Sequence, residues 1–260
     1  MTVTTDRPPA PVLQSLTSSD LSDALRAGFN DFLKAPGFGF FFGGVFSILG
    51  ILISYLLIVH ASSYWVIPIA CGFPLIGPFA AVGLYEISRR IEANEPLEWS
   101  GILGAVLREG GSQLPSYAFV VVFFYLVWMY LAHLVFALSF GLQPLTNIMT
   151  STDILFTSHG ITMLVAGTAV GGALAGLLFA VSVVSVPMLV DRDIDIVSAM
   201  IASFNSVILN QAVMLKWAAI LALSIGVAMV PFFLGMLVVF PVLGHASWHL
   251  YRRSVAPLNG

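Results

Sequence analysis

Charged side chains are scarce in this 260-residue chain, at 9% of its residues, whereas hydrophobic ones make up 58%. Soluble domains carry about 25% charged residues, so the composition predicts an integral membrane protein. Cysteine is nearly absent, since Cys71 is the only one, which excludes disulfide frameworks, zinc knuckles and paired-thiol redox motifs. The formal net charge of -3 gives no basis for nucleic-acid binding.

Motifs of catalytic sites are also missing. The sequence has no serine-nucleophile motif, phosphate-binding loop or zinc-protease motif. The acidic run Asp191–Asp195 lacks the glycine and the distal glutamate of a calcium-binding loop. A coupled transporter usually has an acidic side chain within its spans, and the apolar stretches carry one only at their inner boundary, Glu86. The sequence therefore gives no positive support for an enzyme and weakens the case for a coupled transporter.

Long apolar runs dominate what is present, and they predict an all-α membrane protein with six transmembrane helices arranged as three hairpins. A helix of about 20 residues crosses a bilayer. The expected spans are residues 38–60, 64–87, 115–140, 159–189, 213–230 and 231–251. All ten lysines and arginines then lie on one side of the membrane, and basic residues that flank spans are retained in the cytoplasm. We therefore expect a bacterial inner-membrane protein with both termini cytoplasmic.

Three more polar segments on the cytoplasmic side carry apolar residues at helical spacing. They predict amphipathic interfacial helices, one before each hairpin. Asp20 and Asp193 are expected to cap the first and the third of them. The three apolar faces consist of Leu21, Ala24, Leu25, Gly28, Phe29 and Phe32; of Trp99, Ile102, Leu103, Val106 and Leu107; and of Val197, Met200, Ile201, Phe204 and Ile208.

The expected organisation is a single membrane domain, residues 19–253, between a disordered cytoplasmic tail, residues 1–18, and a short cytoplasmic tail, residues 254–260. Within the domain, residues 20–90, 96–190 and 194–253 are candidate repeat units. The stretch Phe73–Gly77 is echoed by Phe240–Gly244 at a constant offset, which favours duplication of the first and third units. The residues with expected structural roles in this echo are Pro74, Gly77, Pro241 and Gly244.

Small residues and prolines predict how the spans pack. Glycines four residues apart let helices approach closely in lipid, and the span 159–189 has four glycines at such spacings, namely Gly167, Gly171, Gly172 and Gly176. Three prolines between positions 68 and 78 predict a kinked or partly unwound second span. Transporters use interrupted helices to expose backbone groups to a substrate, although kinks without transport are commoner.

The five histidines are the candidate metal ligands. His245 and His249 are four apart on one helix and could bind a metal or a haem, although their neighbours suit an amphipathic inner boundary, which is the favoured interpretation. A second, outer set consists of His60, His133 and His159, and imidazole with thioether ligands would suit copper. Because the sequence does not reveal whether these side chains converge, haem and copper both stay open.

The C-terminal stretch Pro241–Arg253, which reads PVLGHASWHLYRR, resembles the signature of a bacterial membrane family, domain of unknown function 2189. The stretches Pro187–Arg192 and Gly83–Glu86 resemble the family as well, and the resemblance extends from about residue 20 onward. Members of this family are bacterial inner-membrane proteins, and some are labelled cytochrome c oxidase subunit I. The resemblance implies an inner-membrane location more firmly than an activity.

The oxidase label does not fit the residues. A catalytic subunit of that kind uses roughly twelve spans and about six histidines to hold its haems and copper, whereas this chain has five histidines and half as many expected spans. We therefore expect a noncatalytic protein that assists, assembles or scaffolds another membrane complex, such as a respiratory oxidase. A small-molecule or ion transporter or channel is the alternative, and a haem- or copper-binding redox-associated protein is the third hypothesis. The expected partners are the lipid bilayer and another integral membrane complex, with no nucleic acid.

Overall fold

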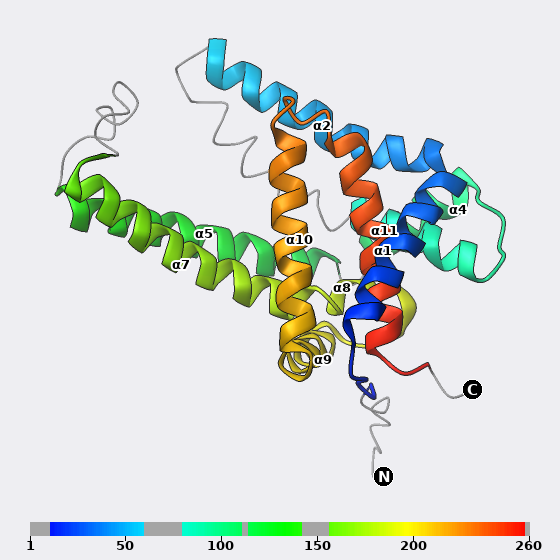
Figure 1. The fold of residues 1–260 in the computed structure, drawn as a ribbon. Helices are drawn as coiled ribbons and strands as arrows, with labels where there is room; N and C mark the ends of the chain where they lie inside the picture. The colour runs from blue at the N-terminus through cyan, green and yellow to red at the C-terminus, as the bar shows by residue number, and fades with distance from the viewer. Residues whose placement is uncertain (1–10, 60–79, 111–113, 142–155, 258–260) are drawn as a thin grey trace, which may run out of the picture. The chain divides into compact units, whose positions relative to one another are not determined.

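The computed structural model describes residues 11–59, 80–110, 114–141 and 156–257, and these residues form helices joined by short connections (Figure 1). Besides a helical segment at residues 80–92, the helices are α1 (Ser18–Lys34), α2 (Pro36–Val59), α4 (Trp99–Gly110), α5 (Leu114–Phe140), α7 (Ser158–Ser182), α8 (Ser185–Asp191), α9 (Ile196–Leu209), α10 (Gln211–Met229) and α11 (Met236–Ser254). Within these ranges the only β interaction is an isolated bridge between Leu13 and Val255. The expectation of an all-α membrane protein is confirmed.

Four helical stretches in the described residues are long and apolar enough to cross a membrane: Pro36–Tyr55, Pro115–Phe140, Ser158–Asp191 and Gln211–Met229. They coincide with the first, third, fourth and fifth expected spans. Most of the second expected span, including Pro74 and Gly77, lies outside the described residues. The sixth corresponds to α11, whose C-terminal half is rich in polar and charged residues, and α11 is not among the four. The count of six therefore stays a prediction.

The chain divides into two compact units. Unit 1 comprises residues 1–118 and 180–260, and unit 2 comprises residues 119–179. Unit 1 contains α1, α2, α4, α8, α9, α10 and α11, and unit 2 contains most of α5 and α7.

Helix α11 forms the centre of unit 1, where it packs against α1, α2, α8 and α10. Two neighbours approach it through glycine. A Cβ atom added to Gly28 of α1 would lie 2.7 Å from the Cα atom of Ala246, and one added to Gly43 of α2 would lie 2.7 Å from the carbonyl oxygen of Met236. Because such distances leave no room for a side chain, glycine at these two positions sets how closely the helices pack.

A break divides the fourth apolar stretch into α7 and α8. At the break, the Ser203 hydroxyl of α9 donates to the Ala180 carbonyl over 2.8 Å and accepts from the Val184 amide over 3.0 Å. Both backbone groups lose their helical partners where the helix is interrupted. The fully buried Ser203 side chain replaces those partners, so one residue of α9 satisfies both sides of the break.

Two helix starts differ from the sequence-based expectation. The N-cap of α1 is Thr17, and Asp20 instead completes a capping box by accepting from the Thr17 amide over 2.8 Å. The N-cap of α9 is Asp195, whose carboxylate accepts from the Ser198 amide over 2.9 Å, so the prediction of Asp193 was wrong by two residues. The run Asp191–Asp195 offers three acidic residues, and only the last directly precedes a helical residue.

The two ends of the described chain are tied together. The Gln14 amide donates to the Ser254 carbonyl and the Ala256 amide to the Val12 carbonyl, each over 2.9 Å. From the end of α9, the Asn210 side chain donates to the Gln14 carbonyl over 3.1 Å. Residues 1–10 and 258–260 lie outside the described residues, but the parts of the expected tails nearest the membrane domain are hydrogen-bonded to each other and to α9.

Helix α9 has two contrasting faces. Its buried residues are the small ones, Ala199, Ala202, Ser203 and Ser206. Its large apolar residues Val197, Ile201, Phe204 and Ile208 are exposed. The small residues allow α9 to pack closely on the rest of unit 1, where it contacts α8 and α10. The large apolar side chains face away from the protein.

Candidate functional site

A buried polar cluster joins three helical segments of unit 1. It consists of Asp31 of α1, Ser88 of the segment 80–92, and His245 and His249 of α11. The Ser88 hydroxyl lies 2.9 Å from Oδ2 of Asp31 and 2.8 Å from Nδ1 of His245. Nε2 of His249 donates to the same Asp31 oxygen over 2.6 Å. Asp31, Ser88 and His245 are buried, so this hydrogen-bonded chain runs from the partly exposed His249 to a fully enclosed imidazole.

The charge of Asp31 is stabilised by its partners. Burial alone would raise the pKa of this carboxyl group, because it removes the charge from water. The hydrogen bond and charge of His249, together with the hydrogen bond from Ser88, outweigh burial and leave the pKa of Asp31 below its ordinary value. The cluster therefore holds an ionised carboxylate inside the protein.

The residue types resemble those of a serine hydrolase triad, but the arrangement differs. In a triad the carboxylate bonds the histidine and the histidine bonds the serine. Here the carboxylate bonds Ser88 directly, and Ser88 has no exposed surface. A substrate cannot reach this hydroxyl, so the cluster is suited to holding protons and fixing helices rather than to nucleophilic attack.

The sequence-based reasoning missed Asp31 because it searched for acidic residues only within the spans. Asp31 follows Ala24 and Gly28 at spacings of seven and three, on the face of α1 that packs against α11. A carboxylate on the buried face of an amphipathic helix was a usable signal. The convergence of Ser88 and His245 on it depends on the tertiary fold and has no local signal.

A second polar network surrounds Tyr251 near the C-terminal end of α11. The Tyr251 hydroxyl donates to Asp191 over 2.6 Å and accepts from Nε of Arg192 over 2.9 Å. A second nitrogen of Arg192 donates to the Ala256 carbonyl over 2.6 Å. Arg192 also pairs with its neighbour Asp191 at 3.4 Å. The network therefore connects α8 to the C-terminal end of α11.

The segment 80–92 has ion pairs of its own. Glu86 is buried and pairs with Arg89 at 2.7 Å and with Arg90 at 2.6 Å. The indole of Trp248 donates to Glu92 over 3.2 Å, which links this segment to α11. Arg89 and Arg90 thus compensate the negative charge of Glu86, the carboxylate expected at the inner end of the second span.

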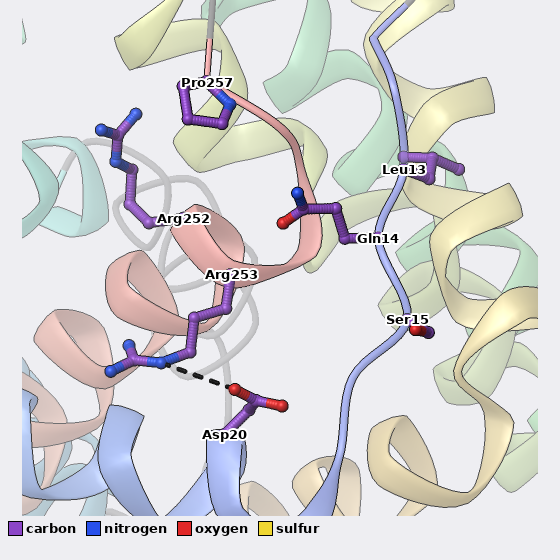
Figure 2. A pocket seen from close by; sticks show the side chains of 7 residues that line it. All are labelled: Leu13, Gln14, Ser15, Asp20, Arg252, Arg253 and Pro257. Carbon is purple, nitrogen blue, oxygen red and sulfur yellow. Dashed lines mark ion pairs between the residues drawn. The ribbon is translucent and has the colours of Figure 1, made fainter.

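A surface hollow of about 780 Å³ lies beside the paired chain ends (Figure 2). Its charged lining residues are Asp20, Arg252 and Arg253. Figure 2 shows Arg253 directed toward Asp20, at 3.9 Å. Arg252 pairs with Glu92 at 3.2 Å, so both guanidinium groups in the hollow already have an acidic partner.

The histidines singled out as candidate metal ligands are in different environments. His245 and His249 both contact the Asp31–Ser88 pair. Nδ1 of His133 bonds the Met129 carbonyl of its own helix over 2.7 Å, and the His159 ring lies 6.2 Å from the Phe140 ring. His60 lies outside the described residues. Among those that are described, no three His, Cys, Asp or Glu side chains gather in a way that could hold a metal ion, so haem or copper binding stays a prediction.

The residues with expected structural roles also have distinct environments. Pro241 lies buried within α11, and a Cβ added to Gly244 would lie 2.5 Å from the Leu84 side chain. In unit 2, a Cβ added to Gly171 would lie 2.9 Å from the Trp128 ring. Nothing lies within 4 Å of the corresponding position at the three other glycines of α7, Gly167, Gly172 and Gly176.

Unit 2 contains an apolar groove of about 550 Å³ between α5 and α7. Trp128, Ala132 and Val135 line it from α5 at helical spacing. The residues that line it from α7 are Met163, Leu164, Gly167, Thr168, Gly171, Gly172 and Ala175. Most of these side chains are small, so the floor of the groove lies close to the helix backbones.

Comparisons with known proteins identify a family but no characterised relative. No curated protein and no solved structure matches the chain. A family model described as "Predicted integral membrane protein (DUF2189)" matches residues 66–191. The matched range includes Gly83–Glu86 and Pro187–Asp191, but neither Arg192 nor the C-terminal stretch Pro241–Arg253. Over residues 66–191 the chain is similar to the DUF2189 family of predicted integral membrane proteins.

Proposed function

We propose that this chain is a noncatalytic multi-pass protein of the bacterial inner membrane that assists or assembles another integral membrane complex. The observation that carries this proposal is the groove between α5 and α7. Gly167, Gly172 and Ala175 line it, and nothing fills the space above the two glycines. Small residues are enriched where transmembrane helices touch, because they let backbones approach closely. A transmembrane helix of a partner is the occupant that best suits such a surface.

The exposure of α5 supports the same proposal. Only 6% of the residues in the apolar segment of α5 are buried within the structure. In the apolar segment of Ser158–Asp191 the buried share is 39%. Its exposed side chains include Phe119, Phe123, Leu126 and Tyr130. Lipid can cover such a surface, but a hairpin that offers both large aromatic groups and a glycine-lined groove is also suited to contact with another protein.

We further propose the topology of six spans, in three hairpins, with cytoplasmic termini. The hydrogen bonds between Gln14 and Ser254 and between Ala256 and Val12 support it, because ends that pair must lie on the same side of the bilayer. An even number of crossings is then required. The exposed apolar faces of α1 and α9, with Phe29, Leu33, Ile201 and Phe204, suit helices that lie in the headgroup region on that side.

Site-specific photocrosslinking tests the partner proposal. A photoreactive residue at Thr168, which lines the groove, should crosslink in cells to one membrane protein. The same residue at Val165, which is exposed on α7 but does not line the groove, should not. A respiratory oxidase is the first partner to examine, because of the label that some family members carry. Crosslinks to lipid alone from both positions would exclude a partner in the groove.

A matched pair of substitutions sharpens this test. Gly172→Leu fills the groove and should abolish co-purification of the partner in mild detergent, whereas Val165→Leu should leave it at the stoichiometric level. The partner helix cannot approach once the leucine side chain stands above the backbone. Equal recovery with both variants would contradict the proposal.

Transport is the second candidate function, and a specific observation favours it. Asp31, Ser88 and His245 form the kind of buried polar cluster that marks ion or proton pathways in membrane proteins. In proteoliposomes an imposed pH gradient should then decay faster with the wild-type protein than with Asp31→Asn. Equal decay with both proteins would dismiss proton transport through this cluster.

A further inference from the structure

The positions of the hydrogen atoms in the buried cluster follow from its geometry. An ionised carboxylate can only accept hydrogen bonds. Ser88 has one hydroxyl hydrogen, and a distance of 2.9 Å to Oδ2 of Asp31 requires that hydrogen to lie between the two oxygens. The contact between Ser88 and His245, at 2.8 Å, then needs its hydrogen from the imidazole. Nδ1 of His245 is therefore the protonated nitrogen, and Ser88 accepts from it.

The other ring nitrogen of His245 carries a free lone pair as a consequence. A neutral imidazole has one N–H group, and Nδ1 holds it. Nε2 is buried and makes no hydrogen bond to any residue that the structure describes. Buried polar atoms without a partner are rare and need an explanation. A lone pair without a partner among the described residues, connected to a carboxylate through a serine hydroxyl, is a position that a proton can occupy.

We propose that Nε2 of His245 is a buried proton-binding site, and that Ser88 and Asp31 form the relay that stabilises the proton it takes up. Binding places the proton on the Nε2 lone pair, and no bond between heavier atoms changes. The Nδ1 hydrogen can then pass to Ser88 as the Ser88 hydrogen passes to Asp31. This leaves a neutral imidazole protonated at Nε2 and a neutral carboxyl group, so the cluster has gained one proton in total and its charge has been neutralised at Asp31.

The groups around His245 determine how strongly the ring holds this proton. Burial of the ring opposes a charge on His245, Asp31 of α1 favours it, and His249, which lies on α11 with His245, opposes it. Ser88 faces the ring from the segment 80–92. Because one carboxylate serves two imidazoles, protons on His245 and His249 compete for it. The site exists whether the protein assists a partner or transports a substrate.

The tautomer of His245 is the direct test. The full chain, labelled with ¹⁵N-histidine and held in lipid nanodiscs, is measured by NMR, and His245→Gln identifies the His245 signals by their loss. At neutral pH we expect a protonated Nδ1 and an unprotonated Nε2, and on acidification Nε2 should become protonated. A protonated Nε2 at neutral pH, an Nε2 that stays unprotonated down to the pH of unfolding, or a metal bound to Nε2 would each overturn the proposal.

Variants separate a proton site from a purely structural cluster. His249→Gln keeps a donor for Asp31 but removes the competing charge, so His245 should titrate at a higher pH. Asp31→Asn removes the attracting charge, so His245 should titrate at a lower pH. If Asp31→Asn does not fold, Ser88→Ala takes its place, and loss of the Ser88 acceptor should shift His245 toward the tautomer protonated at Nε2. Titration at an unchanged pH in His249→Gln, or an unchanged tautomer in Ser88→Ala, would contradict the relay.

Discussion

The two units of this protein differ in what holds their helices together. In unit 1, α1 and α2 approach α11 so closely that glycine is required at the contacts, and buried hydrogen bonds connect Asp31, Ser88 and His245. In unit 2, the contact of Trp128 with Gly171 lies beside an open groove, and a Cβ atom added to any of three other glycines of α7 would have no atom of a neighbouring element within 4 Å. Unit 1 supplies partners for its buried carboxylates Asp31 and Glu86, whereas the apolar surface of unit 2 is suited to contact with lipid or another helix.

The distribution of polar groups follows from this difference. A charge in a membrane protein is tolerated where other protein groups pair with it. Asp31 and Glu86 meet that condition within unit 1, through His249 and through Arg89 and Arg90. Unit 2, residues 119–179, contains a single acidic residue, Asp153, and it lies outside the described residues. Apolar composition alone would not separate the two units, because both contain apolar helices.

The largest difference between the units should appear when the same substitution, glycine to alanine, is made once in each unit and the free energy of unfolding is measured. Gly28→Ala places a Cβ atom 2.7 Å from the Ala246 Cα, and neither backbone can easily move, so we expect a loss of about 3 kcal/mol in the free energy of unfolding. Gly172→Ala meets open space within a helix and should stabilise the protein by roughly 0.5 kcal/mol. Denaturant unfolding in detergent measures both. Equal destabilisation would show that unit 2 is as closely packed as unit 1.

The next effect concerns charge in unit 1. Because the pKa of Asp31 lies below its ordinary value of 3.8, its contribution to stability is fully present above that pH and is lost as the pH falls through the lower, folded-state value. Asp31→Asn should therefore cost about 2 kcal/mol at neutral pH and progressively less below pH 3.8. Unfolding measured against pH for both proteins tests this, and a constant difference down to the lowest pH would contradict it.

Much of the fold could be predicted from the sequence, because long apolar runs leave few alternatives. Four of the expected spans coincide with helices of suitable length and composition. Of the apolar face predicted for α9, four residues are exposed, namely Val197, Ile201, Phe204 and Ile208, and the placement of this helix at the membrane interface stays a prediction. What periodicity did not reveal was that the small face of α9 packs on the protein while Phe204 and Ile208 face outward, because periodicity identifies a face but not its neighbour.

The candidate site was much less predictable. His245 and His249 were noticed for their spacing, which could suit a metal or a haem although an amphipathic inner boundary was favoured. In the structure His245 contacts Ser88 and His249 contacts Asp31, both of which are distant in sequence. Helix α11 was expected to be an ordinary span, although its C-terminal half carries buried polar residues that interact with α1 and the segment 80–92. Long-range pairing of polar groups has no local signal, so only the tertiary fold brings these residues together.

The smallest effect we predict lies where unit 1 meets the end of α7. Ser203→Ala removes the hydroxyl that bonds both the Ala180 carbonyl and the Val184 amide. An unsatisfied buried backbone group costs about 1 to 3 kcal/mol, and backbone adjustment at the break between α7 and α8 can recover part of it, so we expect a net loss of about 1.5 kcal/mol. Asn205→Ala, at an exposed site of the same helix, is the control and should change the free energy of unfolding by less than about 0.5 kcal/mol. If the two variants unfold at the same denaturant concentration, the break between α7 and α8 does not depend on α9, and buried polar partners matter less to unit 1 than its close-packed glycines do.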